Sequence, residues 1–212
     1  MKAYIFDLDG TLLDSMHVWQ QIDVDFLARR HIAVPPDYTD IITPMGSTEC
    51  ATYTIARFNL PEQPEDLLRE WHAMAIDAYS HSVPLKPYAL DYLRALRKKG
   101  AKVAIATSLS PELHQPALER HGLSALFDAI AHSDEVGCGK SKPDVFLLAA
   151  ERLGVAPEDC VVFDDILPAI AAAKSAGMMA YAVYDESSAA DWAAMQRIAD
   201  GTLRDFREAP LL

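Results

Sequence analysis

From about residue 87 to the C-terminus, short apolar runs alternate with segments whose apolar residues recur every three or four positions. A short apolar run bounded by turn residues is typical of a buried strand, and the longer period is typical of a helix. Glycines that follow several of the periodic segments mark the ends of helices. The pattern predicts strands at 102–106, 129–131, 160–163 and 179–183, helices at 88–99, 111–121, 143–153 and 167–176, and one more amphipathic helix around Trp192, Met195 and Ile198.

The first apolar run, at residues 4–6, is followed at once by Asp7-Leu8-Asp9-Gly10-Thr11. We expect this run to be a buried strand, and Gly10 allows the chain to turn sharply out of it. Strands that alternate with helices predict a parallel sheet whose connections are right-handed crossovers. The predicted fold class is therefore α/β, with a doubly wound parallel sheet.

The region between the first strand and residue 86 carries no convincing strand pattern. Helical periodicity is found instead at 16–30, 47–58 and 65–79, and prolines divide and border these segments. We expect an inserted α-helical cap domain at residues 15–85 and a core domain of residues 1–14 and 86–212, with hinges near 13–15 and 82–86. The alternative is that the helices pack directly on the same core.

The chain is acidic, with 31 Asp and Glu against 19 Lys and Arg and a formal net charge of −12. Nucleic acids and anionic membranes bind through basic surfaces, so neither is an expected partner. The three cysteines form no CxxC pair, which favours a reducing, cytoplasmic location over a disulfide scaffold. Asp7 and Asp9 interrupt the only apolar segment that could serve as a signal peptide, and no later stretch is long enough to span a bilayer. We expect a soluble protein.

Polar side chains stand at the carboxyl ends of the expected strands or in the loops that follow them. In an open α/β sheet, this edge is where ligands bind. The residues are Asp7 and Asp9, Thr107 and Ser108, Lys140, and Asp164 and Asp165. Carboxylates crowded at one edge repel one another unless a cation lies among them, and Mg²⁺ prefers oxygen ligands. The hydroxyl and ammonium groups are suited to hold phosphate oxygens.

Two other ligand-binding motifs are disfavoured because required positions hold other residues. A calcium loop of the EF-hand kind that began at Asp7 would need glycine at its sixth position and glutamate at its twelfth, where Leu12 and Val18 stand. A nucleotide-binding P-loop that ended at Lys140 would need glycine where Asp134 stands. An ordinary strand-to-turn exit is the remaining alternative for the Asp7 segment, because Asp and Gly are common turn residues.

With these residues assembled, the chain resembles the haloacid dehalogenase superfamily, and within it the phosphatases and phosphomutases whose helical cap follows the first strand. Four segments carry the resemblance in order along the chain. The segment from Asp7 to Ser15 matches the first motif of that superfamily, Thr107 the second, the segment from Lys140 to Asp144 the third, and the segment from Val161 to Asp165 the fourth. The resemblance covers nearly the whole chain.

The resemblance implies a two-step phosphoryl transfer with Mg²⁺ as the cofactor. Asp7 would attack phosphorus and become an aspartyl phosphate, and Asp9 would act first as the acid and then as the base. The phosphoryl oxygens would be held by Thr107, Ser108 and Lys140. The metal ligands would be Asp7, the backbone carbonyl of Asp9, and Asp165 with Asp164 as an assisting ligand.

The expected activity is hydrolysis of a small phosphorylated metabolite, for example a sugar phosphate. In the superfamily, an acid at the position of Asp9 favours phosphate esters over phosphonates and carbon–halogen bonds. The segment between Asp14 and Ser82 also contains no lysine, which phosphonate cleavage would recruit from the cap.

The alternative enzyme is a sugar phosphomutase of the β-phosphoglucomutase kind. Those relatives carry basic residues before the glycine that corresponds to Gly46, where this chain is neutral, so simple hydrolysis is the first choice. The candidate substrate-facing residues of the cap are Trp19, Thr43, Met45, Gly46 and Ser47. A metabolite-binding protein that keeps the fold without catalysis is the alternative from another class.

Overall fold

The structure is a computed structural model that describes residues 2–42 and 45–211. Within these residues the chain divides into two compact units. The first contains the chain up to Ser15 together with Val83 onward, and the second contains Met16–Ser82. We call them the α/β unit and the helical unit.

The α/β unit is built on a parallel sheet. Among the described residues the sheet has six strands in the order β3-β2-β1-β4-β5-β6, and every neighbouring pair is parallel. The strands are β1 (Ala3–Phe6), β2 (Lys102–Thr107), β3 (Ala129–His132), β4 (Cys160–Asp164), β5 (Met179–Val183) and β6 (Gly201–Leu203). The strand order changes direction between β1 and β4, which is where ligands bind in such sheets. The doubly wound parallel sheet expected from the sequence is confirmed.

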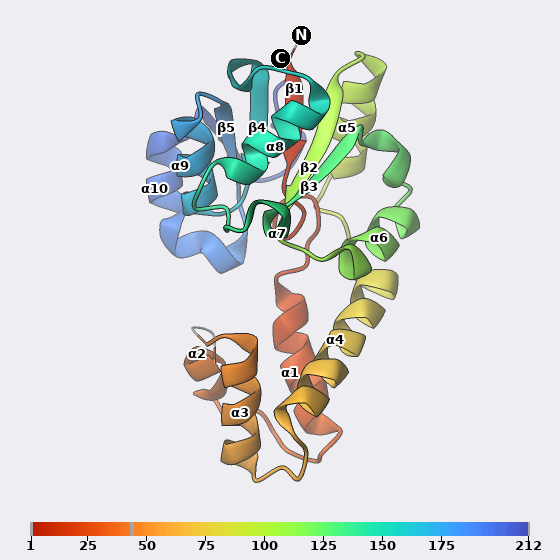
Figure 1. Ribbon diagram of the computed structural model, residues 1–212, viewed down its shortest axis with the longest axis vertical. Helices are drawn as coiled ribbons and strands as arrows, with labels where there is room; N and C mark the ends of the chain where they lie inside the picture. Colours follow the sequence, from red (N-terminus) through yellow and green to blue (C-terminus); the bar gives the residue numbers. More distant parts are fainter. Residues whose placement is uncertain (1, 43–44, 212) are drawn as a thin grey trace. The chain divides into compact units, whose positions relative to one another are not determined.

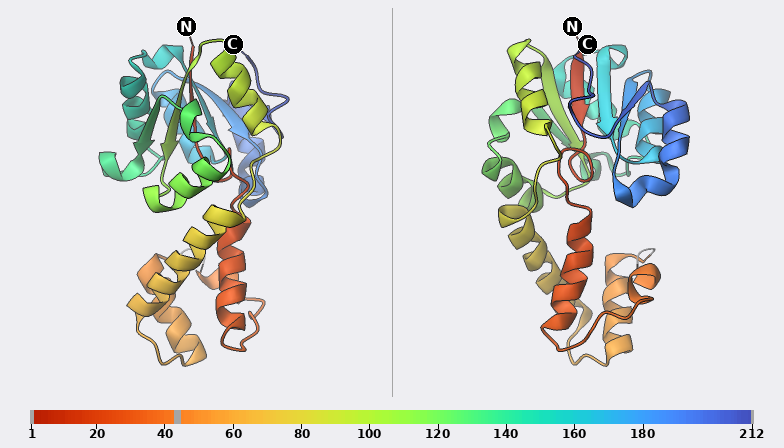
Figure 2. Two further views of the ribbon diagram at one scale, coloured as in Figure 1. Left: turned by 90° about the vertical axis from the view of Figure 1, so that its right-hand side faces the viewer. Right: turned by 180° about the vertical axis from the view of Figure 1, so that it is seen from behind.

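Helices cover both faces of this sheet. On one face lie α8 (Asp144–Leu153), α9 (Leu167–Ser175) and α10 (Trp192–Ile198), as Figure 1 shows, and α5 (Ala89–Lys98) lies on the other (Figure 2). The connections after β2 and β3 contain α6 (Pro111–Arg120) and α7 (Ser133–Val136). Short 3-10 helices lie before β3 at Ser124–Leu126, before β4 at Pro157–Asp159 and after β5 at Glu186–Asp191.

Alternation along β1 sends its side chains to two different layers. Ile5 packs in the aliphatic layer with residues of α8 and α9, whereas Tyr4 and Phe6 point into an aromatic layer on the opposite face. The Phe6 ring stacks on Phe163 of β4, with 4.8 Å between the centroids. Both rings are fully buried, and burying such a side chain stabilises a fold by about 1.5–3 kcal/mol. This packing holds β1 in place and therefore fixes the backbone of the residue that follows, Asp7.

The helical unit has its own core. It comprises α1 (His17–Ala28), α2 (Tyr38–Ile42), α3 (Ser47–Phe58) and α4 (Pro64–His81). Phe26 of α1 packs edge-on against Trp71 of α4, with 5.4 Å between the ring centroids. Arg30 lies over the Phe26 ring and donates hydrogen bonds to Glu62 and Glu70. The helices of this unit therefore pack on one another within Met16–Ser82.

The two segments that join the units both belong to the α/β unit, and they pair with each other. Leu13 forms an antiparallel bridge with Leu85. The Asp14 N–H donates to the Pro84 carbonyl at 2.9 Å. These contacts hold both segments as a short two-stranded link.

The structure differs from the sequence prediction mainly in short elements that were not predicted, namely α2, α7, β6 and the 3-10 helices given above. Elsewhere the predicted ends differ from the observed ends by one or two residues. For example, the helix expected from Tyr88 begins at Ala89, because Tyr88 has a φ of 64° in the left-handed region. Within the described ranges, no helix has the length and apolar character needed to cross a membrane.

Candidate active site

Asp7 lies where β1 ends and is still held by the sheet. Its N–H donates to the Phe163 carbonyl of β4 at 3.0 Å. The chain then turns within a few residues, because the N–H groups of Leu12 and Leu13 both donate to the Leu8 carbonyl, at 2.9 and 2.8 Å. The turn therefore begins directly after Asp7, whose backbone the sheet holds in place.

Gly10 is required in this turn for two reasons. Its φ is 76°, a conformation that residues with a side chain rarely adopt. In addition, a Cβ at this position would lie 2.3 Å from Oδ2 of Asp165. Glycine thus lets the turn approach the end of β4 closely.

Three acidic side chains meet beside this turn. Carboxylate oxygens of Asp7, Asp164 and Asp165 all lie within 4.8 Å of one another. The three residues are 5%, 0% and 3% exposed, so the cluster is almost removed from solvent. Thr11 donates to Oδ1 of Asp165 at 3.4 Å, and the Ile166 N–H donates to Oδ1 of Asp164 at 3.2 Å. The convergence expected from the strand ends is therefore observed for these three acids.

Lys140 brings one positive charge into the cluster. Its buried ammonium group donates to Oδ1 of Asp7 and, at 2.9 Å, to Oδ2 of Asp164. Burial acts to lower the pKa of Lys140, but the adjacent Asp164 and Asp7 carboxylates raise it more, so the group stays charged. One ammonium against three carboxylates leaves the ionised cluster with a net negative charge.

Burial and this uncompensated charge together raise the pKa of two of the acids. Burial is the main cause of the rise in the pKa of Asp7 to about 7, which Lys140 opposes and Asp164 reinforces. Burial, followed by Asp164 and Asp7, raises the pKa of Asp165 to about 9. Buried oxygen ligands that lack a compensating charge fit a hard divalent cation such as Mg²⁺. The expectation of a divalent metal site at these residues is thus consistent with the structure.

We expect the metal-free protein to lose stability as the pH rises from about 7 to about 9. The native pKa of Asp165, about 9, lies far above its ordinary value of 3.8, so in this interval the native state binds a proton that the unfolded chain has lost. Stability falls with rising pH wherever the unfolded state binds fewer protons. The melting temperature in EDTA, measured at several pH values across this interval, gives the dependence of stability on pH. We expect a smaller dependence in Asp165→Asn, and also when Mg²⁺ replaces EDTA. A melting temperature in EDTA that rose with pH would contradict the assignment.

Asp9 is set apart from the acidic cluster. Its carboxylate is half-buried, and Oδ1 accepts a hydrogen bond from the Ser15 hydroxyl at 2.7 Å. Among the described residues, Asp7, Asp164 and Asp165 lie close enough together to share a metal ion, and the side chain of Asp9 is not part of this group. The Asp9 charge still acts on the cluster, because it contributes to the raised pKa of Asp7.

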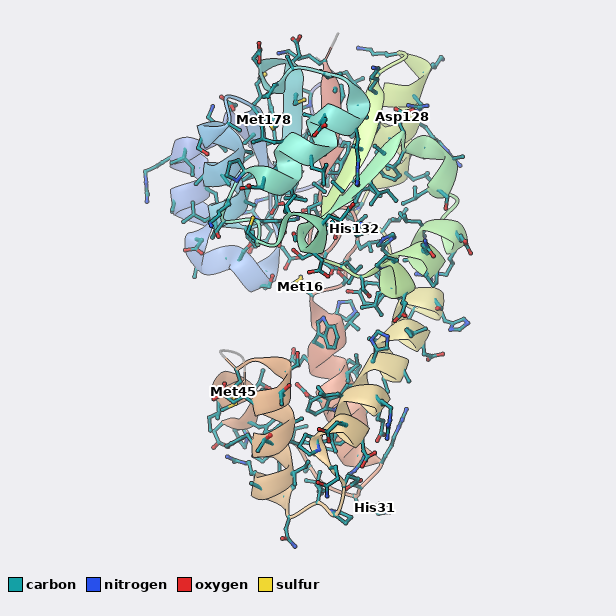
Figure 3. The ribbon with its side chains drawn as sticks, viewed as in Figure 1. Met16, His31, Met45, Asp128, His132 and Met178 are labelled. Atoms are coloured by element: carbon teal, nitrogen blue, oxygen red, sulfur yellow. The ribbon has the colours of Figure 1, made fainter. Side chains whose placement is uncertain are left out.

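Thr107 and Ser108 stand at the carboxyl end of β2, next to β1. Oγ1 of Thr107 accepts from the Leu109 N–H at 3.0 Å, and the hydroxyls of Ser108 and Ser133 lie 2.8 Å apart. Ser133 directly follows β3, whose last residue His132 is labelled in Figure 3. Ser133 was not among the predicted site residues, although the rule that selected the other strand ends applies to it equally.

The candidate residues of the helical unit differ in exposure. Trp19 lies on α1 and is 45% exposed. Met45 is half-buried, and Gly46 and Ser47 are exposed at the start of α3. Thr43 lies outside the described residues.

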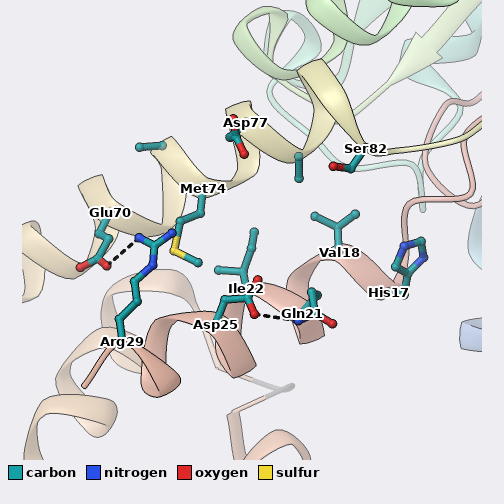
Figure 4. A pocket seen from close by; sticks show the side chains of 12 residues that line it. His17, Val18, Gln21, Ile22, Asp25, Arg29, Glu70, Met74, Asp77 and Ser82 are labelled. Carbon is teal, nitrogen blue, oxygen red and sulfur yellow. Dashed lines mark hydrogen bonds and ion pairs between the residues drawn. The ribbon is translucent and has the colours of Figure 1, made fainter. Parts of the chain in front are cut away.

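A pocket of about 360 Å³ lies between α1 and α4 of this unit (Figure 4). Val18, Ile22 and Met74 form apolar parts of its lining, and Glu70 and Arg29 form an ion pair at 3.2 Å beside it. His17 lines this pocket, whereas the described candidates Trp19 and Met45 do not.

A model of the haloacid dehalogenase-like hydrolases matches residues 1–177. The chain belongs to this family. The resemblance that the four motifs indicated is therefore confirmed.

The chain is similar to proteins of known activity and to solved structures. The phosphorylated carbohydrates phosphatase of Thermotoga maritima is 30% identical over 84% of this chain and 82% of its own length. A solved structure of a candidate beta-phosphoglucomutase from Thermotoga maritima has a TM-score of 0.86 and 27% identity, and the match covers 96% of this chain and 94% of that one. The bifunctional riboflavin kinase/FMN phosphatase of Arabidopsis thaliana is 32% identical over 86% of this chain, but the match spans only 48% of that protein. At the level of the family, the expected phosphoric monoester hydrolase is confirmed.

Proposed function

We propose that this member of the haloacid dehalogenase-like hydrolases is a Mg²⁺-dependent phosphatase for a small phosphorylated metabolite, with a phosphorylated carbohydrate as the first candidate. The observation that carries the proposal is the buried cluster in which Asp7 meets Lys140, Asp164 and Asp165. These residues supply a nucleophile, a fixed cation and oxygen ligands at one point, which are the parts that phosphoryl transfer needs.

The reaction has two steps at Asp7. First, a carboxylate oxygen of Asp7 forms a bond to phosphorus while the bond from phosphorus to the ester oxygen breaks, and Asp9 gives a proton to that leaving oxygen. In the second step, the ionised Asp9 takes a proton from the water that cleaves the aspartyl phosphate and releases phosphate. The Ser15 hydroxyl orients Asp9 by donating to it at 2.7 Å.

Charge compensation comes from Lys140 and from a bound cation. Asp7, Asp164 and Asp165, together with the Asp9 backbone carbonyl, would hold Mg²⁺, which when bound supplies positive charge opposite the carboxylates and the phosphoryl oxygens. Lys140 keeps its ammonium group between Asp7 and Asp164 and so limits the repulsion between these acids. The hydroxyls of Thr107 and Ser108 bind phosphoryl oxygens at the end of β2.

The helical unit, residues 15–85 in the sequence prediction, serves in this proposal as a cap that limits access of water to the intermediate. Its substrate-facing residues would be Trp19, Met45, Gly46 and Ser47, with Thr43 as a further candidate. Support for a carbohydrate substrate comes from the phosphatase of Thermotoga maritima, whose name specifies phosphorylated carbohydrates.

The substrate proposal is tested by phosphate release from a panel of phosphorylated sugars, sugar alcohols, nucleotides and amino acids, with and without Mg²⁺. We expect Mg²⁺-dependent hydrolysis that is fastest for one group of sugar or sugar-alcohol phosphates. The matched assay adds a bisphosphorylated sugar primer to a single hexose phosphate. If one isomer converts to another faster than phosphate is released, the protein is a mutase. If Mg²⁺ binds and no compound in the panel is hydrolysed, it is a binding protein.

A further inference from the structure

A second ion pair, partly buried, lies in the α/β unit outside the acidic cluster. Nζ of Lys86 donates to Oδ2 of Asp185 at 2.6 Å, and the two side chains are 12% and 5% exposed. Asp14 lies 3.6 Å from the same ammonium group, but its carboxylate is 48% exposed, so solvent screens this second contact. The principal partner of Lys86 is therefore Asp185.

Lys86 also fixes the returning linker through its backbone. Its N–H donates to the Leu12 carbonyl at 2.9 Å, within the turn that follows the first strand. Three residues earlier, the Val83 carbonyl accepts from the guanidinium group of Arg120 on α6. The linker from Val83 to Lys86 is thus attached to the α/β unit at both of its ends.

Asp185 lies close to the metal-binding edge of the sheet. It follows β5 by two residues, and β5 pairs with β4 so that Ala182 is opposite Asp164. Oδ1 of Asp185 accepts from the N–H and the hydroxyl of Ser187, at 2.9 and 2.6 Å, which holds the carboxylate in one orientation. Its negative charge contributes to the raised pKa of Asp165, after burial and the nearer acids.

We propose that Lys86 is a positioning residue of the phosphoryl-transfer site: its ammonium group neutralises Asp185 beside the acidic cluster while its backbone ties the linker to the catalytic turn. The role of Lys86 in turnover rests on the phosphatase function proposed above. Without Lys86, the edge of the site would carry one more uncompensated buried carboxylate. Because charges in a partly buried site interact over several ångströms, that carboxylate would repel a phosphate dianion.

The test compares Lys86→Met, Lys86→Arg, Asp185→Asn and the double variant Lys86→Met/Asp185→Asn. The direct readout is the dissociation constant of inorganic phosphate in saturating Mg²⁺, measured by calorimetry, together with KM and kcat for a generic phosphate ester. We expect Lys86→Met to weaken phosphate binding and raise KM about tenfold, with a smaller change in kcat. Lys86→Arg, which keeps the charge, should stay within about threefold of the wild type.

The double variant distinguishes charge compensation from a purely structural tether. The amide oxygen that Asp185→Asn introduces can still accept from Ser187, so this substitution removes the charge with little change in shape. If Lys86 acts by compensation, the double variant recovers most of the phosphate affinity that Lys86→Met loses. A double variant as impaired as Lys86→Met would overturn the proposal, as would unchanged phosphate affinity in Lys86→Met.

The proposal for Lys86 can still be tested if Lys86→Met fails to fold or if the wild type is inactive. If Lys86→Met alone does not fold, Asp185→Asn by itself decides the matter. Lys86 then keeps only its solvent-screened contact with Asp14, so its charge should tighten phosphate binding, and weaker or unchanged binding contradicts the proposal. If the wild type hydrolyses no ester, the phosphatase proposal fails. The calorimetric comparison of phosphate binding still tests Lys86 in that case.

Discussion

An Asp7→Asn variant is expected to lose at least about 10³-fold in kcat for every phosphate ester that the wild type hydrolyses. An amide oxygen does not form the acyl phosphate, so the first step has no nucleophile. The remaining site still contains Lys140, Asp164 and Asp165, so substrate binding should persist while turnover is lost. Phosphate release under single-turnover conditions measures the effect.

The same variant should not be destabilised. Burial raises the pKa of Asp7 to about 7, which means that its ionised form is unfavourable in the metal-free native state. Replacing it with a neutral amide removes that cost, and the melting temperature in EDTA at pH 8 should be equal to or above that of the wild type. Asp91→Asn, at an exposed position on α5, is the matched control and should keep full activity. Turnover by Asp7→Asn close to that of the wild type would end the proposed mechanism.

An Asp9→Asn variant should lose about 10²–10⁴-fold in kcat while keeping its affinity for Mg²⁺. The lost function is proton transfer, because the carboxylate of Asp9 is separate from the acids that group around Asp7. The metal contact assigned to Asp9 uses its backbone carbonyl, which the substitution preserves. Calorimetric titration with Mg²⁺ and steady-state kinetics together test both halves of this expectation.

The leaving group of the ester sharpens the test of Asp9. An alkyl phosphate needs a proton on its leaving oxygen, whereas a nitrophenyl ester leaves without one, so the first step of Asp9→Asn should be impaired more for the alkyl substrate. Hydrolysis of the aspartyl phosphate also needs Asp9 as a base, so this intermediate should accumulate with the nitrophenyl ester. Ser15→Ala, which removes only the hydrogen bond to Asp9, should give a much smaller loss. A large loss of Mg²⁺ affinity in Asp9→Asn would mean that the carboxylate itself is a ligand.

The acidic cluster was predictable because one geometric rule governs it. Carboxyl ends of parallel strands meet at one edge of a sheet, so acids that follow two such strands are expected to converge. The sequence places Asp7 after the first strand and Asp164 and Asp165 at the end of the fourth, and the structure brings all three within 4.8 Å. The helices of the α/β unit were similarly predictable, because a strong apolar period and a terminal glycine mark most of them.

Other features depend on contacts that no local pattern reveals. The strand β6 is only Gly201–Leu203, and Gly201 is needed because a Cβ there would lie 2.4 Å from the Tyr181 ring. Lys86 pairs with Asp185, although neither residue belongs to a motif that the sequence analysis recognised. Such features follow from tertiary packing, which overrides the local sequence preferences.

The central position of β1 has a consequence for biosynthesis. Ala3 pairs with Lys102 on one side and with Cys160 on the other, so β1 leaves the ribosome long before either of the strands that flank it. Contacts between such distant parts of a chain form slowly, and an apolar strand without partners is prone to aggregation. Asp7 therefore acquires its acidic surroundings only after Asp164 and Asp165 have been synthesised, and a chaperone that shields the nascent β1 would increase the yield of folded protein.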